Sequence, residues 1–143
     1  MKNIKSKPAG YSGKPLIDKL GLKEGMNTLI LYPPKNYFSL LGDLPDGIRI
    51  KKQPRGLFDF IHLFTAEAAL LERDFPIVSK TVAPKGMLWI SWPKGSSGIA
   101  TDLDENIVRE IGLKTNLVDI KVAAIDEIWS GLKFVHRKEK RTI

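Results

Sequence analysis

Apolar residues fall into short runs along the chain, and turns rich in glycine and proline separate these runs. A run that is almost continuously apolar, such as 27–32, is typical of a strand buried on both faces. Apolar residues three or four positions apart, such as Leu16 and Leu20, are typical of one helix face. The pattern predicts strands at 27–32, 48–51, 58–64, 87–92, 117–124 and 129–137. It predicts helices at 15–20, 36–41 and 65–82, and a fourth that begins at Asp102 or Asp104 and ends at Gly112.

The order of these elements indicates an α/β fold. Strands that alternate with helices are joined by right-handed crossovers, which build a mostly parallel, twisted sheet flanked by helices. The last two predicted strands are close enough in sequence to pair as a hairpin, so we expect a C-terminal antiparallel strand pair. At 143 residues we expect a single domain, residues 15–136, between a basic N-terminal segment, 1–14, and a basic tail, 137–143.

The formal net charge of +7 resides in the two ends of the chain. Residues 1–14 hold four lysines and no acid, and residues 137–143 hold four basic residues and one glutamate. Residues 15–136 hold equal numbers of basic and acidic residues. This distribution predicts weak, salt-sensitive contact of the termini with nucleic acid, and a nucleic-acid-associated protein is one functional hypothesis.

Composition excludes several kinds of site. The chain has no cysteine, which excludes disulfides and thiolate ligands or nucleophiles. Its two histidines, His62 and His136, lie on distant segments, so we predict no metal site. No uncharged apolar run is long enough to span a bilayer, and no apolar segment follows the N-terminal lysines. We therefore expect a cytoplasmic protein with no membrane partner.

Two turns that lead into buried strands carry a resemblance to a known architecture. They are Lys23-Glu24-Gly25-Met26 and the Pro-Lys-Gly turn at 84–86, which precedes the apolar run 87–92. In order and spacing, these segments resemble the Rossmann-like methyltransferase fold, which also tends to finish with an antiparallel strand pair. The resemblance implies that fold for most of the chain.

A second resemblance involves short stretches spread over nearly the whole chain. The stretches are Gly10-Tyr11-Ser12-Gly13, Pro15-Leu16, Lys19-Leu20-Gly21, Trp92-Pro93-Lys94, Ser97-Gly98, Thr101-Asp102-Leu103, Val118-Asp119, Lys121-Val122, Asp126 and Trp129-Ser130-Gly131-Leu132. In these stretches the chain resembles a widespread bacterial family of uncharacterised small proteins, a domain of unknown function (DUF3052-like). The resemblance implies a bacterial, cytoplasmic setting and brings no established activity.

The residues that usually bind the cofactor in such a fold are missing. A nucleotide-type cofactor needs a glycine-rich turn after the first strand and a carboxylate at the end of the second. Here the turn is 32–36, without glycine and with Pro33 and Pro34, which lack N–H donors. The second strand ends in 51–54, Lys-Lys-Gln-Pro, with no acid. We therefore predict no cofactor, neither S-adenosylmethionine nor NAD, and these departures favour a domain that binds a small ligand or a partner over an enzyme.

The loop after the predicted strand 87–92 holds a candidate anion site. Ligands of open α/β sheets bind beyond the carboxyl ends of the strands, where this loop lies. Its lysine, hydroxyls and carboxylate suit an anion beside the next helix, whereas the alternative is a plain loop in which Thr101 or Asp102 caps that helix. The candidate residues are Lys94, Ser96, Ser97, Thr101 and Asp102, over which Tyr11 and Ser12 could close.

Asp126 and Trp129 lie between the last two predicted strands and complete the candidate ligand-binding set. The alternative is that Asp126 accepts hydrogen bonds within a turn and that Trp129 packs at the rim of the core. His62, within an apolar strand, is expected to be a core histidine with satisfied hydrogen bonds. An unpaired apolar edge at 129–135 would favour a homodimer.

Three functional hypotheses result. The leading one is a Rossmann-like domain that binds a small anionic ligand or a protein partner at its strand ends, without S-adenosylmethionine-dependent methylation. The alternative is a divergent S-adenosylmethionine-dependent methyltransferase that grips its cofactor by another route. The second alternative is a nucleic-acid-associated protein that acts through its basic termini.

Overall fold

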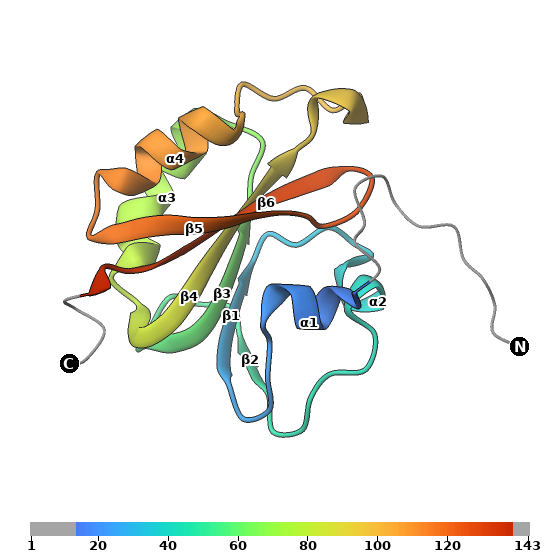
Figure 1. Cartoon of the computed structure of the whole chain (residues 1–143), viewed down its shortest axis with the longest axis vertical. Coiled ribbons are helices and arrows are strands. Elements are labelled where there is room, and N and C mark those ends of the chain that lie inside the picture. The colour runs from blue at the N-terminus through green and yellow to red at the C-terminus, as the bar shows by residue number, and fades with distance from the viewer. Residues whose placement is uncertain (1–13, 139–143) are drawn as a thin grey trace, which may run out of the picture.

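A computed structural model describes residues 14–138 and contains one six-stranded mixed sheet with the strand order β2-β1-β3-β4-β6-β5 (Figure 1). Strands β1 to β4 run parallel to one another, and β6 runs antiparallel to both β4 and β5. The α/β fold with a C-terminal antiparallel pair is therefore confirmed. The elements are α1 (Leu16–Leu20), β1 (Asn27–Leu31), α2 (Tyr37–Leu41), β2 (Arg49–Lys51), β3 (Phe58–Phe64), α3 (Ala68–Ser79), β4 (Val82–Pro93), η1 (Gly95–Ser97), α4 (Glu105–Leu113), β5 (Leu117–Ala124) and β6 (Trp129–His136).

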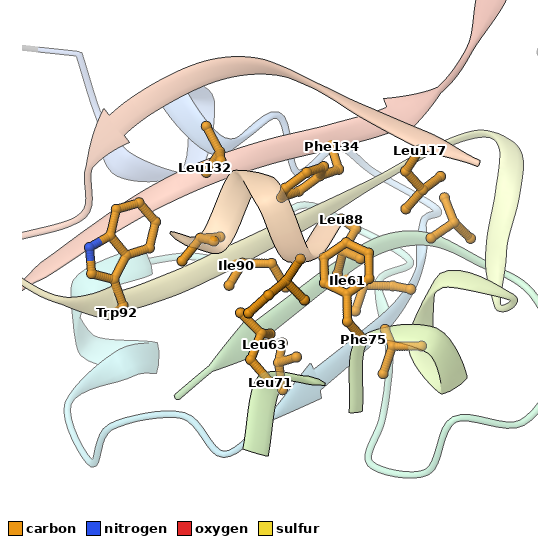
Figure 2. Close-up of a cluster of buried hydrophobic side chains, with 14 of the residues drawn as sticks. Ile61, Leu63, Leu71, Phe75, Leu88, Ile90, Trp92, Leu117, Leu132 and Phe134 are labelled. Carbon is orange, nitrogen blue, oxygen red and sulfur yellow. The ribbon is translucent and has the colours of Figure 1, made fainter. Parts of the chain in front are cut away.

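Helices cover both faces of the sheet. Helices α3 and α4 cover the face on which Leu63, Ile90 and Phe134 form the larger core (Figure 2). On the other face, α1 and α2 pack over Phe60 and Trp89. The alternation of side chains along the central strands thus supplies two cores, which is why these strands are nearly continuously apolar.

The two tryptophans of β4 face opposite sides of the sheet. Trp92 belongs to the core beneath α3 and α4, and Trp89 is fully buried on the α1 side. The indole N–H of Trp89 donates a hydrogen bond of 2.9 Å to the carbonyl of Leu20, the last residue of α1. This bond ties the end of α1 to the centre of the sheet.

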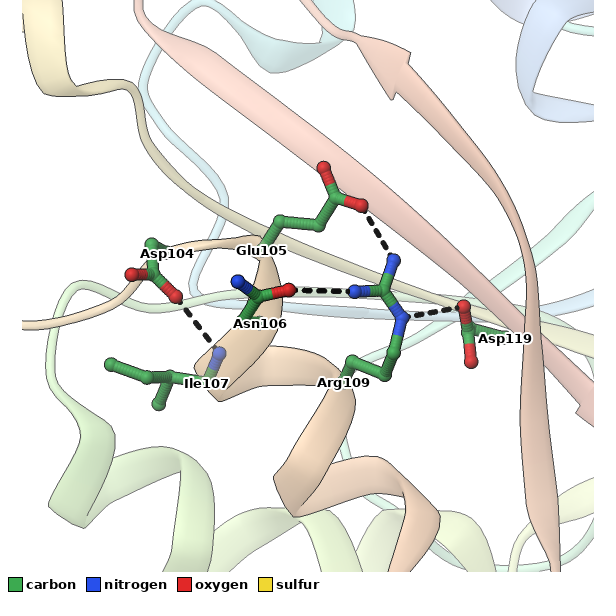
Figure 3. Close-up of polar contacts among 6 residues, drawn as sticks. All are labelled: Asp104, Glu105, Asn106, Ile107, Arg109 and Asp119. Carbon is green, nitrogen blue, oxygen red and sulfur yellow. Dashed lines mark hydrogen bonds and ion pairs between the residues drawn. The ribbon is translucent and has the colours of Figure 1, made fainter.

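Helix α4 begins at a side-chain cap and is linked to β5. The carboxylate of Asp104 accepts the N–H of Ile107 at 2.9 Å, so Asp104, rather than Asp102, is the N-cap of α4 (Figure 3). Arg109 then donates to Asp119 of β5 at 2.9 Å. The same guanidinium donates hydrogen bonds to the side chains of Asn106 and Glu105, which fixes its orientation on the surface of α4 (Figure 3).

Several local predictions are wrong. The turn predicted at 84–86 lies inside β4, where a Cβ on Gly86 would stand 2.6 Å from the carbonyl of Phe58. Gly112 lies inside α4 instead of ending it. A glycine is needed at this position because the Phe134 ring fills the space that a side chain would take. The helix predicted at 65–82 begins only at Ala68, and its N-cap is Glu67.

The connection from β2 to β3 contains no helix. Strand β2 has only three residues, and the chain returns through 52–57 to the start of β3 on the other side of β1. The side chain of Asn27 bonds the carbonyl of Leu57 at 2.7 Å, which holds this short return against β1. The regular alternation of strands and helices is therefore interrupted at the β2 edge.

The predicted homodimer edge is also wrong. Residues 129–135 belong to β6, which is already paired to β4 on one side and β5 on the other. Among the residues that the structure describes, the outer strands of the sheet are β2 and β5. Among residues 14–138, no helix is long and apolar enough to cross a membrane.

Candidate functional site

A groove of about 420 Å³ lies where β1 and β2 end. Ligand sites of small molecules generally span roughly 300–1,000 Å³, and in open α/β sheets they lie beyond the carboxyl ends of the strands. The groove meets both conditions. Its lining is apolar apart from one lysine and one phenol: Ile30, Leu31, Tyr32, Pro33, Phe38, Ile50 and Lys52.

Three large apolar side chains of this lining are exposed: Tyr32, Phe38 and Ile50. They come from the turn after β1, from α2 and from β2. Exposed apolar side chains that converge on one concavity mark a binding surface more strongly than the same residues scattered singly. The arrangement suits the face of a flat aromatic ring.

The turn after β1 has an unusual backbone. Tyr32 has a φ of 56°, and it is the single non-glycine residue with positive φ within residues 14–138. A bulky residue in the left-handed region is strained by about 1–2 kcal/mol, and such strain gathers at functional sites. Tyr32 therefore adopts the conformation that glycine usually provides in the turn after the first strand.

The electrostatics of the groove are cationic. Lys52 is the single lining residue that carries a full charge. Arg73 of α3 lies close to Tyr32, but it is paired with Asp74 at 2.8 Å, so this pair adds little net charge to the groove. No carboxylate lines the groove in the part of the chain that the structure describes. An anionic group on a ligand would be favoured there.

A buried polar chain lies behind the groove. The Tyr37 hydroxyl is 2.8 Å from Nδ1 of His62, and Nε2 of His62 is 2.7 Å from the Ser91 hydroxyl. All three side chains are fully buried and come from α2, β3 and β4. Tyr37 also packs edge-on against Phe38, which lines the groove. The chain of hydrogen bonds thus braces α2, and with it one wall of the groove, against the sheet.

Burial decides the ionisation of these groups. It lowers the pKa of His62 to about 3 and raises the pKa of Tyr37 well above its usual range. Both side chains are therefore neutral at neutral pH. A neutral imidazole donates from one nitrogen and accepts at the other, which matches its two hydroxyl partners. The expectation of a core histidine with satisfied hydrogen bonds is confirmed.

The loop at 94–102 has structural contacts that explain much of its sequence. The Thr101 hydroxyl donates to the carbonyl of Ala66 at 2.6 Å, and Asp102 accepts the N–H of Ala68 at 2.7 Å. Asp102 therefore holds the first turn of α3, a helix that it does not precede in sequence. The Ser97 hydroxyl accepts the N–H of Ile99 at 3.1 Å.

The other candidates of this loop lie in and around η1. Ser96 is exposed, and Lys94 is half-buried with its backbone N–H on the carbonyl of Ile128 at 2.7 Å. This bond places the loop next to the β5–β6 turn. Whether Lys94, Ser96, Ser97, Thr101 or Asp102 contacts a ligand stays a prediction, and Tyr11 and Ser12 lie outside the described residues.

Asp126 and Trp129 have clear structural contacts. Asp126 is buried and accepts the N–H groups of Ile128 and Trp129 at 2.9 and 2.8 Å, as the turn interpretation expects. Trp129 is half-buried and packs edge-on against Phe64 at a ring distance of 5.1 Å. Their part in ligand binding is likewise untested.

The groove was missed because its residues are ordinary in sequence. Phe38 and Ile50 look like core residues of a short helix and a short strand, and nothing local shows that both remain exposed. The one usable indication was the position of 32–36 after the first strand, which we interpreted only as a damaged cofactor turn.

Comparison with known proteins bears on the fold. No family model and no curated protein matches the chain. Among solved structures, a SAM-dependent methyltransferase from Aquifex aeolicus has a TM-score of 0.60 at 14% identity, covering 83% of this chain and 86% of that one. Magnesium protoporphyrin IX methyltransferase from Synechocystis PCC 6803 with bound SAH has a TM-score of 0.57 at 11% identity, covering 85% and 78%. The DhpI–SAH complex has 0.57 at 11%, covering 87% and 83%.

The chain has the fold of the SAM-dependent methyltransferases. This likeness corrects two predictions: the leading hypothesis of a non-methylating domain and the prediction that no cofactor is bound. Both relied on the missing glycine and the missing acid, and the described chain has a groove at the ends of β1 and β2 without either residue. The alternative hypothesis, a divergent methyltransferase, takes their place. At identities of 14% and below, the likeness itself concerns the fold, so the activity remains a proposal.

The lining of the groove fits the adenosyl part of S-adenosylmethionine. The volume and the apolar wall of Tyr32, Phe38 and Ile50 suit an adenine ring. The polar partners differ from the expected ones, since Lys52 stands at the end of β2 where a carboxylate was expected. The lining therefore fits the adenosyl group, but with polar contacts that differ from the usual ones.

Proposed function

We propose that this protein is a divergent S-adenosylmethionine-dependent methyltransferase whose groove at the ends of β1 and β2 receives the cofactor's adenosyl group. The observation that carries the proposal is the apolar groove of about 420 Å³ at that place in this fold. Two solved structures with this fold are methyltransferases by name, and one of them and the DhpI complex hold SAH.

The residues of the groove would contact different parts of the cofactor. Phe38 and Ile50 offer apolar surface to the adenine, and the strained turn at Tyr32 brings a third such surface over the end of β1. Lys52 supplies the cation for the carboxylate of the cofactor's amino-acid part, because that carboxylate is the anionic group of the ligand. When bound, the cofactor supplies an electrophilic methyl group.

The buried Tyr37–His62–Ser91 chain would act as positioning residues. It holds α2 against β3 and β4, and α2 carries Phe38. A wall held by short, buried hydrogen bonds loses little conformational entropy when a ligand arrives.

The experiment is a titration with S-adenosylhomocysteine, in which binding is measured by calorimetry and by the shift of the melting temperature. A ligand at about 100 times its Kd stabilises the folded protein by roughly 2.7 kcal/mol, which shifts Tm by several degrees. Ile50→Glu places a charge on the apolar wall and should abolish binding. Ile120→Glu is the matched control, because Ile120 is also an exposed isoleucine but lies on β5 at the other edge of the sheet.

Two outcomes would overturn the proposal: no binding by the wild-type protein, or equal loss of binding in the two variants. Membership of the DUF3052-like family and a bacterial, cytoplasmic setting belong to the same proposal. They rest on the short stretches shared along the sequence.

A further inference from the structure

Three lysines gather at the end of α1, on the α1 side of the sheet at the β5 edge. Lys121 of β5 and Lys133 of β6 are directly paired across the two strands. The ammonium of Lys121 donates to the carbonyl of Lys19 at 3.3 Å. The ammonium of Lys133 lies 4.0 Å from where a Cβ of Gly21 would stand, and Lys23 follows two residues later. We call Lys23, Lys121 and Lys133 the lysine face.

The charges of the lysine face repel one another. Like charges directly opposite on paired strands are destabilising. The pKa of Lys133 is lowered, first by burial and then by the charges of Lys121 and Lys23. The pKa of Lys19 is lowered by burial and then by Lys121, so the like-charge field reaches the helix end as well.

No carboxylate within the described chain pairs with this face. The three ion pairs among residues 14–138 all involve Arg73 or Arg109, and the acid of β5, Asp119, is bonded to Arg109 of α4. The end of α1 compensates only in part, since Lys121 takes one carbonyl of a five-residue helix. A bound anion would remove the repulsion that the protein itself leaves in place.

We propose that the lysine face binds the phosphate backbone of single-stranded nucleic acid. Lysine is a compact point charge that suits single phosphate oxygens. Lys23 and Lys121 are exposed, so an extended ligand can reach the face. Neighbouring strands are about 5 Å apart, which lets Lys121 and Lys133 contact successive phosphates of one strand. This surface lies at the opposite end of the sheet from the groove, and the inference does not depend on the proposed function.

The test is the salt dependence of binding to a fluorescent 12-nucleotide single-stranded RNA, measured by anisotropy with the full chain. The variant Lys23→Gln/Lys121→Gln/Lys133→Gln removes the face without introducing repulsion at the α1 carbonyl. The matched control, Lys51→Gln/Lys85→Gln/Lys114→Gln, removes the same charge from exposed lysines elsewhere.

Three phosphate contacts should contribute about 2 to the slope of log affinity against log salt. We expect the first variant to lose about that much of the slope, and the control to keep the wild-type slope. The proposal is overturned if both triple variants lose equally, because net charge or the termini would then bind the RNA. It is also overturned if the wild type does not bind, or if oligoglutamate competes as well as RNA at equal charge.

Discussion

The buried His62 should make the protein lose stability as the pH falls below neutral. Its pKa is lowered to about 3 in the folded protein, against about 6.5 in the unfolded chain. Between these values the unfolded chain binds a proton that the folded protein does not, so the free energy of unfolding rises with pH in this window. The contribution of His62 to the free energy of unfolding is complete above about pH 6.5. It declines as the pH falls and is fully lost near pH 3.

The size of this loss follows from the same linkage. Each pH unit below the unfolded pKa costs up to about 1.4 kcal/mol, so moving from pH 7.5 to pH 5.0 costs about 2 kcal/mol through His62 alone. Urea denaturation at the two pH values measures it. The variant His62→Gln has no titrating ring and should lose about 2 kcal/mol less than the wild type over this interval.

The matched control is His136→Gln, which removes the other histidine and keeps the buried one. It should retain the contribution of His62. If His62→Gln does not fold, the imidazole nitrogen shifts of the wild type decide the question, since the His62 ring should remain neutral at pH 5.0. Equal pH-dependent losses in the wild type and His62→Gln, or a protonated ring at pH 5.0, would refute the reasoning.

Three further predictions concern single positions. Tyr32→Gly should be more stable than Tyr32→Ala by about 1 kcal/mol in urea denaturation, because only glycine relieves the positive φ; the usual order, Ala above Gly, would contradict the strain. Lys52→Glu should weaken S-adenosylhomocysteine about tenfold in calorimetry and leave methylthioadenosine, which lacks the carboxylate, unchanged; equal effects on both ligands would remove Lys52 from the carboxylate. Gly112→Ala should cost about 1–3 kcal/mol in thermal unfolding, since the Phe134 ring occupies the space of the new methyl group, and a stabilised variant would show that the ring moves aside freely.

Much of the fold was predictable because its local patterns agree with the tertiary structure. Strands β1, β3, β5 and β6 follow apolar runs whose lengths the sequence shows within a residue or two. Helix α1 ends at Gly21, which has a φ of 87°. The opposite facing of Trp89 and Trp92 follows from strand alternation alone.

The errors arose where a distant part of the chain decided the outcome. The proline and glycine at 84–86 predict a turn, yet β4 continues through them, and its pairing with β3 shifts register between Val82 and Met87. Gly112 resembles a helix end, and its real constraint is a ring on β6, 22 positions away. No local pattern contains these partners.

The candidate site shows the same division. The sequence by itself determined that the turn after β1 lacks glycine and that β2 ends in lysines, so the usual polar contacts to a nucleotide-type cofactor are absent. Only the tertiary structure decided that Phe38, Ile50 and Tyr32 converge on one groove and that Tyr37, His62 and Ser91 form one buried chain. The physical reason is that local patterns fix backbone conformation over a few residues, whereas a site and its ionisation depend on which strands lie side by side and on how deeply their neighbours bury them.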